Sequence, residues 1–162
     1  MITRSLVLTL TLLAACKPPD RPAPADTPAP ATVSLEQFQG LRWLEGTWRG
    51  AEAAGAPFFE RYQFLDDSTL RRYSFTDSTL AQISDSGRTS LRGSRVIGGD
   101  AEPRWEVTSF DSVSWHFESL RDPGRAFTWS RNTADTWTAT LTWPDPQGNA
   151  QERVYTLVRL AP

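Results

Sequence analysis

The sequence predicts an all-β fold of short antiparallel strands, and two features of the chain carry this expectation. Residues 136–143 read TWTATLTW, in which four threonines alternate strictly with apolar residues, the period of a strand that buries one face. Similar runs recur along the chain and are separated by turn-forming clusters such as Asp122-Pro123-Gly124. Strands joined by tight turns form an antiparallel meander, which either closes into a barrel or folds into a two-sheet sandwich.

The expected elements are about ten strands and one short helix. The helix is expected over 34–44, where Ser34 can cap the first turn and an apolar stripe follows, formed by Leu35, Phe38, Leu41 and Leu44. The strands are expected at roughly 46–53, 57–65, 69–76, 79–84, 89–97, 103–110, 112–119, 125–131, 136–143 and 150–160. Turns are expected at 66–68, 84–87, 98–100, 122–124 and 144–149.

Residues 1–15 have the composition of a secretory signal peptide. Arg4 supplies the positive start, residues 6–13 form the apolar centre, and Ala14 and Ala15 are the small residues that precede a cleavage site. A membrane-spanning helix needs about 20 apolar residues, so this run is too short to be one. We therefore expect the segment to be removed from the mature chain.

Cys16 is the only cysteine of the chain and directly follows this segment. The sequence Leu13-Ala14-Ala15-Cys16 resembles the lipobox of bacterial lipoproteins, in which the cysteine is diacylated by chains such as palmitate and its new amino terminus is acylated after cleavage. The resemblance implies a lipid anchor in the cell envelope, and each buried methylene of such an anchor contributes about 0.8 kcal/mol. Lys17, in place of the aspartate that retains enterobacterial lipoproteins in the inner membrane, favours the outer membrane. The alternative is an ordinary signal peptide with an incidental cysteine.

Residues 16–33 are expected to form a tether. The stretch after the cysteine holds six of the chain's twelve prolines among small and polar residues, a composition that cannot form a core. Such chains extend by about 3.1 Å per residue and act as semi-rigid spacers. A peptide ligand for a proline-recognising partner is the alternative interpretation.

Residues 34–162 have the length of one domain and contain all the aromatic residues of the chain. They hold no cysteine, so no disulfide can stabilise the domain and its core must hold by packing. Loss of the signal peptide removes Arg4 and takes the formal net charge from −2 to −3. A mildly acidic chain without a basic patch predicts no nucleic-acid partner. We expect a monomer whose partners are the membrane, through the lipid on Cys16, and a small apolar ligand.

The start of the domain, a short helix running into Gly46-Thr47-Trp48-Arg49-Gly50, favours a barrel over a sandwich. It resembles the start of lipocalin-like (calycin) barrels, particularly bacterial lipocalin-like domains of unknown function that open with an L-x-W-L-x-G-T-W pattern. The resemblance implies an up-and-down barrel in which Trp48 plugs the closed end and an arginine of the last strand stacks on it. Arg159, in YTLVRL, stands where that arginine is expected, and the contact would join the first strand to the last. The alternative is a core tryptophan in another β fold.

Two better-known branches of these barrels match the chain less well. The T-D-Y signature of true lipocalins is absent, and Glu52 replaces the last glycine of the nitrobindin-like pattern G-x-W-x-G-x-G. The nitrobindin-like branch binds haem through a histidine near the C-terminal end of the barrel, whereas the one histidine here, His116, lies on the solvent face by strand alternation. A single histidine excludes the usual histidine-rich zinc sites, and the aspartates cluster in turns without the spacing of a calcium loop. We expect neither a cofactor nor a metal.

A barrel of eight to ten strands can enclose one small ligand. In PFFERYQF, residues 57–64, Glu60 shares a face with Tyr62, and if this face points inward the carboxylate needs a partner such as Arg72 or Arg131. The opposite register, with Glu60 in solvent, is the alternative. The candidate ligand contacts are Glu60, Tyr62, Trp115, Phe117, Phe127, Trp129, Arg131, Trp137 and Tyr155. An interior simply filled by these aromatics is the other interpretation.

Three classes of function follow from this interior. The first is a membrane-anchored protein that binds a small apolar or amphipathic molecule in its barrel. The second is a structural or interaction module of the cell envelope with a solidly packed barrel, and a cavity distinguishes the first from it. The third is an enzyme in which Glu60, Tyr62 and an arginine perform acid–base chemistry, although the chain shows no nucleophile–histidine–acid pattern, phosphate-binding loop or metal motif.

Overall fold

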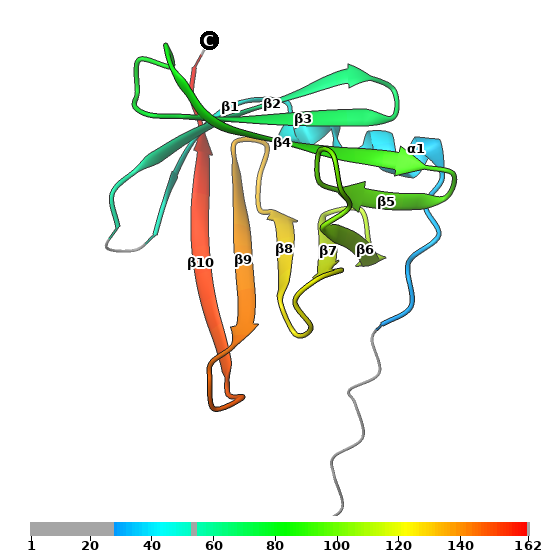
Figure 1. The fold of residues 1–162 in the computed structure, drawn as a ribbon. Coiled ribbons are helices and arrows are strands. Elements are labelled where there is room, and N and C mark those ends of the chain that lie inside the picture. Colours follow the sequence, from blue (N-terminus) through cyan, green and yellow to red (C-terminus); the bar gives the residue numbers. More distant parts are fainter. Residues whose placement is uncertain (1–27, 53–54, 162) are drawn as a thin grey trace, which may run out of the picture.

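A computed structural model describes residues 28–52 and 55–161, and it confirms the predicted all-β fold. The ten strands of the described residues are antiparallel, and pairing of β1 with β10 closes them into a barrel with the order β1-β10-β9-β8-β7-β6-β5-β4-β3-β2 (Figure 1). The strands are β1 Gly46–Ala51, β2 Phe58–Asp66, β3 Thr69–Phe75, β4 Ile83–Arg92, β5 Arg95–Gly98, β6 Trp105–Phe110, β7 Ser114–Ser119, β8 Ala126–Arg131, β9 Thr136–Pro144 and β10 Ala150–Arg159.

The expected signal peptide, Cys16 and the tether up to residue 27 lie outside the described residues. Within the described part of the chain, every helix is too short or too polar to cross a bilayer.

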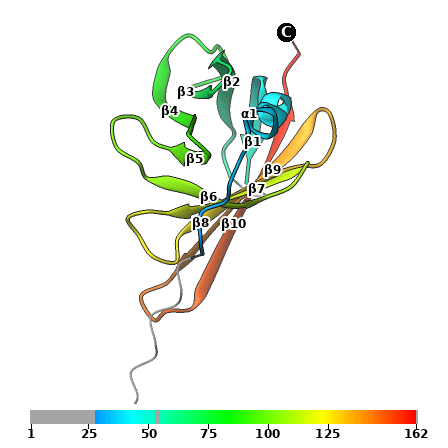
Figure 2. The same ribbon diagram turned by 90° about the vertical axis from the view of Figure 1, so that its right-hand side faces the viewer.

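The predicted N-terminal helix is present as α1, Leu35–Gln39, continued by a 3-10 helix η1, Gly40–Leu44. Ser34 and Gln37 form a capping box, with Ser34 Oγ accepting from the Gln37 amide at 3.1 Å and Gln37 Oε1 accepting from the Ser34 amide at 2.8 Å. Three members of the expected apolar stripe, Phe38, Leu41 and Leu44, are fully buried, whereas Leu35 is 47% exposed. The helices lie across one end of the barrel, which we call the closed end (Figures 1 and 2).

Trp48 seals the closed end as the sequence predicts. It is 1% exposed, and its indole N–H donates to the Leu44 carbonyl at 2.7 Å. In the register of β1 with β10, Trp48 is opposite Arg159, whose guanidinium carbon lies 4.1 Å from the centroid of the indole ring. This cation–π contact ties the first strand to the last.

The Arg159 guanidinium also hydrogen-bonds two backbone carbonyls at the C-terminal end of the helical segment. It donates to the Glu45 carbonyl at 2.6 Å and to the Trp43 carbonyl at 3.0 Å. Gly46 has φ +125°, and a Cβ there would lie 2.4 Å from Arg159 Nη1. The glycine of the G-x-W triplet is therefore required both by its backbone angle and by the passage of the arginine.

Around β4, the expected strands 79–84 and 89–97 and the expected turn 84–87 differ from the observed elements. The expected strand 79–84 is mostly a connection, and the expected turn 84–87 lies inside β4. Gly87 is opposite Arg72 of β3, and a Cβ there would meet Arg72 Nη2 at an ordinary contact distance of 3.4 Å, so this stretch is a paired strand and not a turn. The expected strand 89–97 is divided between β4 and β5 by a turn at Gly93. The strand count stays at ten because one expected strand is lost and another is split.

Packed structure begins before Ser34, within the segment assigned to the tether. The Val33 side chain is 1% exposed, its amide donates to the Ser94 carbonyl at 2.8 Å, and the Ala31 amide donates to the Val107 carbonyl at 2.9 Å. The two bonds connect this segment to the β4–β5 turn and to β6, beside the position where β5 and β6 pair through only two residues each. The last residues before α1 therefore complete the barrel wall.

Because consecutive strands alternate in direction, the connections fall into two sets. The β2–β3, β4–β5, β6–β7 and β8–β9 turns lie at the closed end, and the remaining connections lie at the opposite end, which we call the mouth. The β9–β10 hairpin in Figure 1 marks the mouth, far from α1.

Candidate functional site

The half of the barrel toward the mouth encloses a cavity of about 860 Å³. Its walls come from the inward faces of eight strands, and its rim includes the β5–β6 loop, residues 99–104. Several rim residues are solvent-exposed, among them Asp85, Glu102 and Arg104, so the cavity opens at the mouth.

Small inward residues create this space. Register pairs Arg72 with Gly87, Leu70 with Thr89 and Thr89 with Gly98, so β4 and β5 present two glycines and a threonine to the interior. On β9, Ala139 stands between Trp129 of β8 and Tyr155 of β10 and also lines the cavity. The interior is hollow where these four residues replace the large side chains found elsewhere.

Aromatic rings form one wall of the cavity. Phe58 packs edge-on against Tyr155 with ring centroids 5.4 Å apart, and Trp105 packs likewise against Phe127 at 4.9 Å. A second group at the cavity floor joins Tyr62, Trp129 and Trp137, with centroid distances of 5.7 to 6.3 Å. Aromatic pairs in this arrangement contribute about 0.5–1.5 kcal/mol each beyond their buried area, so the rings of this wall stabilise one another.

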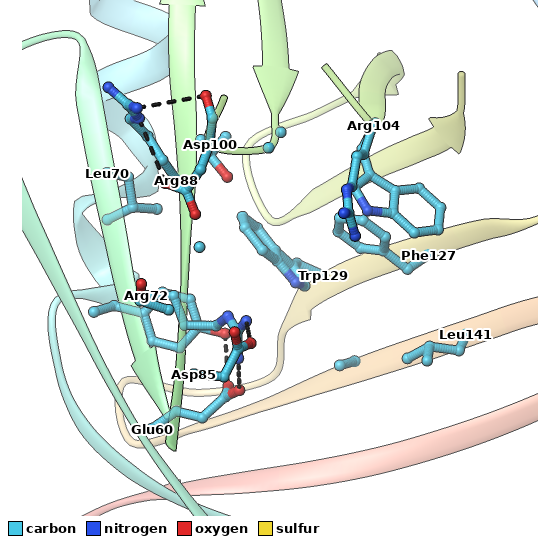
Figure 3. A pocket seen from close by; sticks show the side chains of 18 of the residues that line it. Glu60, Leu70, Arg72, Asp85, Arg88, Asp100, Arg104, Phe127, Trp129 and Leu141 are labelled. Carbon is cyan, nitrogen blue, oxygen red and sulfur yellow. Dashed lines mark hydrogen bonds and ion pairs between the residues drawn. The ribbon is translucent and has the colours of Figure 1, made fainter. Parts of the chain in front are cut away.

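A charged network on β2, β3 and β4 forms the opposite wall (Figure 3). Glu60 points inward, and its partner is Arg72, one of the two arginines considered from the sequence: Arg72 Nη1 donates to Glu60 Oε1 at 2.7 Å. The Tyr62 hydroxyl donates to Glu60 Oε2 at 2.8 Å, and Arg72 Nη2 donates to Asp85 Oδ2 at 2.7 Å. Both oxygens of Glu60 are thus occupied, and its side chain is only 12% exposed.

Three groups of the network, Tyr62, Arg72 and Asp85, have shifted pKa values. Burial raises the pKa of the Tyr62 phenol well above its ordinary value, and the neighbouring Glu60 carboxylate raises it further. Burial, the largest single effect, lowers the pKa of Arg72, but Glu60, Tyr62 and Asp85 together raise it by more, so the net direction is upward. The hydrogen bond from Arg72 lowers the pKa of Asp85. These shifts keep the Tyr62 phenol neutral and the Arg72 and Asp85 side chains charged near neutral pH.

The structure brings together six of the nine residues predicted to contact a ligand. Trp115 and Phe117 are buried in the core, 2% and 0% exposed, and do not line the cavity. Arg131 is exposed at the end of β8, where its Nε donates to the Thr133 carbonyl at 3.2 Å, so it cannot partner Glu60. The six that line the cavity are Glu60, Tyr62, Phe127, Trp129, Trp137 and Tyr155.

His116 lies on the outer face of β7. Its ring nitrogens contact Thr128 Oγ1 at 2.8 Å and Glu118 Oε1 at 3.0 Å. Over residues 28–52 and 55–161, no group of three or more His, Cys, Asp or Glu side chains is placed to hold a metal ion.

Sequence reasoning missed five charged residues of the cavity lining, Asp85, Arg88, Asp100, Glu102 and Arg104. Asp85 lies in the serine- and glycine-containing stretch that was expected to be a turn, and Arg104 precedes β6 in a loop. Arg104 stands directly before Trp105, which lines the cavity, and that adjacency was the available signal.

Comparisons with known proteins leave the family open. No family model matches the chain, and no curated protein matches it. The solved structure of a redesigned β-barrel is similar over 76% of this chain and 96% of its own, with a TM-score of 0.35 and 12% sequence identity. The class of the protein, a closed ten-stranded antiparallel barrel with a cavity, therefore rests on its own strand pairing.

Proposed function

We propose that this barrel binds a small amphipathic molecule inside its cavity. The observation that carries the proposal is a cavity of about 860 Å³ with an aromatic wall and one charged wall. Ligand sites are typically concave, mostly apolar spaces of about 300 to 1,000 Å³ with a few fixed polar groups.

The two walls suit different parts of one ligand. Burial of an apolar body against Trp129, Phe127 and Tyr155 would contribute about 25 cal/mol for each Å² removed from water. The network of Glu60, Arg72 and Tyr62 is already satisfied by its own hydrogen bonds, so it needs no rearrangement before binding. Affinity is expected from the aromatic wall and orientation from the polar groups.

We further propose that the barrel is held at the cell envelope by a lipid on Cys16, with the outer membrane favoured over the inner. The support is the lipobox-like sequence Leu13-Ala14-Ala15-Cys16 and the proline-rich stretch that follows it. Fractionation of cells that make the full chain tests this: the wild type is expected in the membrane fraction and Cys16→Ser in the soluble fraction. Equal distribution of the two would contradict the anchor.

The geometry favours binding over the two alternatives. A structural module with a solidly packed barrel would lack the cavity of about 860 Å³ that this barrel contains. Acid–base catalysis by Glu60 and Tyr62 is disfavoured because both oxygens of Glu60 accept hydrogen bonds and the pKa of Tyr62 is raised away from neutrality.

Titration of the full chain with the uncharged fluorescent probe 1-N-phenylnaphthylamine tests the proposal. Ala139→Phe fills the cavity and is expected to weaken binding at least tenfold. Thr140→Phe places the same side chain on the outer face of the same strand and is expected to leave the affinity within twofold, with thermal unfolding confirming that both variants fold. Absence of binding by the wild type, or equal loss in both variants, would overturn it.

A further inference from the structure

The charges around the cavity are paired, with one exception. Each carboxylate that lines the cavity has an arginine within ion-pair distance. The pairs are Glu60–Arg72 at 2.7 Å, Asp85–Arg72 at 2.7 Å, Asp100 with Arg71 and with Arg88 (3.8 Å to the latter), and Glu102–Arg121. Among the described residues that line the cavity, a ligand therefore meets no carboxylate that lacks a counter-charge.

Arg104 is the exception. Among the residues that the structure describes, it is the one charged side chain lining the cavity that forms neither an ion pair nor a side-chain hydrogen bond with the protein. The lining holds four carboxylates and three arginines, and two arginines outside it, Arg71 and Arg121, pair with Asp100 and Glu102. With these two included, every carboxylate of the lining is paired and Arg104 is left as the unpaired cation. The chain as a whole carries a formal charge of −2.

The backbone holds Arg104 firmly although it lies in a loop. Its amide donates to the Gly98 carbonyl at 2.8 Å, and its carbonyl accepts from the Leu120 amide at 2.8 Å. The loop is shaped by Gly99, with φ +126°, where a Cβ would lie 2.3 Å from the Glu102 carbonyl oxygen. The backbone of Arg104 is therefore held by two hydrogen bonds, while its guanidinium is available to bind a ligand.

Arg104 also stands at the junction of mouth and aromatic wall. The next residue, Trp105, packs against Phe127, and Arg104 lies near Phe127 in Figure 3. The charge of Arg104 also helps to lower the pKa of Asp85. A guanidinium binds carboxylate and phosphate groups through paired, charge-assisted hydrogen bonds. An anionic group held by Arg104 at the mouth would leave its apolar body against Trp105, Phe127 and Trp129.

We infer that the ligand is an amphipathic organic anion whose acidic group is bound by Arg104. The inference rests on the proposed binding function and names the class of ligand: a carboxylate or a phosphate monoester with an apolar body. Arg72 does not take this role because Glu60, Ser74 and Asp85 already accept its hydrogen bonds.

Displacement of bound 1-N-phenylnaphthylamine from the full chain tests the inference. The competitors share one tail and differ in head group: dodecanol, dodecanoate and dodecyl phosphate, each below its micelle concentration. For the wild type, at least one anion is expected to displace the probe at a concentration tenfold or more below that of dodecanol. The more effective anion identifies the acidic group.

Arg104→Gln is expected to remove this preference and to leave displacement by dodecanol unchanged, whereas Arg104→Lys keeps a reduced preference. Arg125→Gln is the matched control, because Arg125 is exposed in the β7–β8 turn at the mouth but does not line the cavity. Equal displacement by the alcohol and both anions, or an anion preference that survives in Arg104→Gln, would overturn the inference while probe binding stands. Failure of the probe to bind at all would instead overturn the proposed binding function, and with it the inference.

Discussion

The closed end and the mouth half of this barrel are built from the same strands and differ in what fills them. At the closed end Trp48, Leu44 and Phe38 are completely buried beneath α1 and η1, and Arg159 is pinned between an indole ring and two backbone carbonyls. In the mouth half, inward positions are held by Gly87, Thr89, Gly98 and Ala139, and the cavity takes the space.

The difference teaches that strand alternation decides which side chains point inward, whereas their volume decides whether the interior is core or cavity. The packed half supplies stability, and the hollow half has rigid aromatic and charged walls because it is built on that packed base. Changes at the two ends should therefore affect different properties.

The largest effect is expected from Trp48→Ala at the closed end. Removal of a fully buried tryptophan together with its hydrogen bond to Leu44 should lower the free energy of unfolding by about 3–5 kcal/mol, measured by urea denaturation. Trp143→Ala removes a partly exposed tryptophan of β9 near the mouth and should cost far less. Equal losses in the two variants would break the distinction between the halves.

An intermediate effect is expected at alkaline pH from Tyr62. Because its pKa is raised in the folded state, the folded protein binds the phenolic proton more tightly than the unfolded chain does. This contribution is fully present below the unfolded value of about 10 and is lost as pH rises from there toward the folded pKa, by up to about 1.4 kcal/mol per pH unit.

The comparison with Tyr62→Phe isolates this contribution. Unfolding free energies measured from pH 8 to 11 should fall more steeply for the wild type than for Tyr62→Phe, which keeps the ring and every other titrating group. Parallel curves would show that Tyr62 is not buried as described.

The smallest effect is expected from Arg131→Gln. Arg131 is exposed at the closed end of β8 and does not line the cavity, so the affinity for 1-N-phenylnaphthylamine should stay within twofold of the wild type. A large loss would mean that the ligand reaches the closed end, contrary to the division between the two halves.

Much of the closed end could be predicted from the sequence because its signals are local. The capping box at Ser34, the alternation of TWTATLTW and the place of Trp48 in the first strand, directly after the helical segment, each depend on residues a few positions apart. The arginine on the last strand needed the resemblance to lipocalin-like barrels, since its contact with Trp48 spans the whole domain.

The mouth half was harder to predict because small and polar residues occur both in turns and in strands that line a cavity. Ser84-Asp85-Ser86-Gly87 has the composition of a turn, yet it forms part of β4 and pairs with β3. Likewise, the phase of Trp115 and Phe117 places them inside the barrel, but phase alone does not tell whether a ring meets a cavity or a packed neighbour. The position of each residue along the barrel axis depends on the register shift between neighbouring strands. The alternation of residues within one strand does not reveal this shift.

Native mass spectrometry of the full chain, purified gently and compared with its denatured mass, tests the central claim most directly. The account predicts a stoichiometric extra mass on the wild type and on Thr140→Phe that is missing from Ala139→Phe. The mass of the bare chain for all three proteins, together with no binding of 1-N-phenylnaphthylamine, would contradict a ligand-binding cavity.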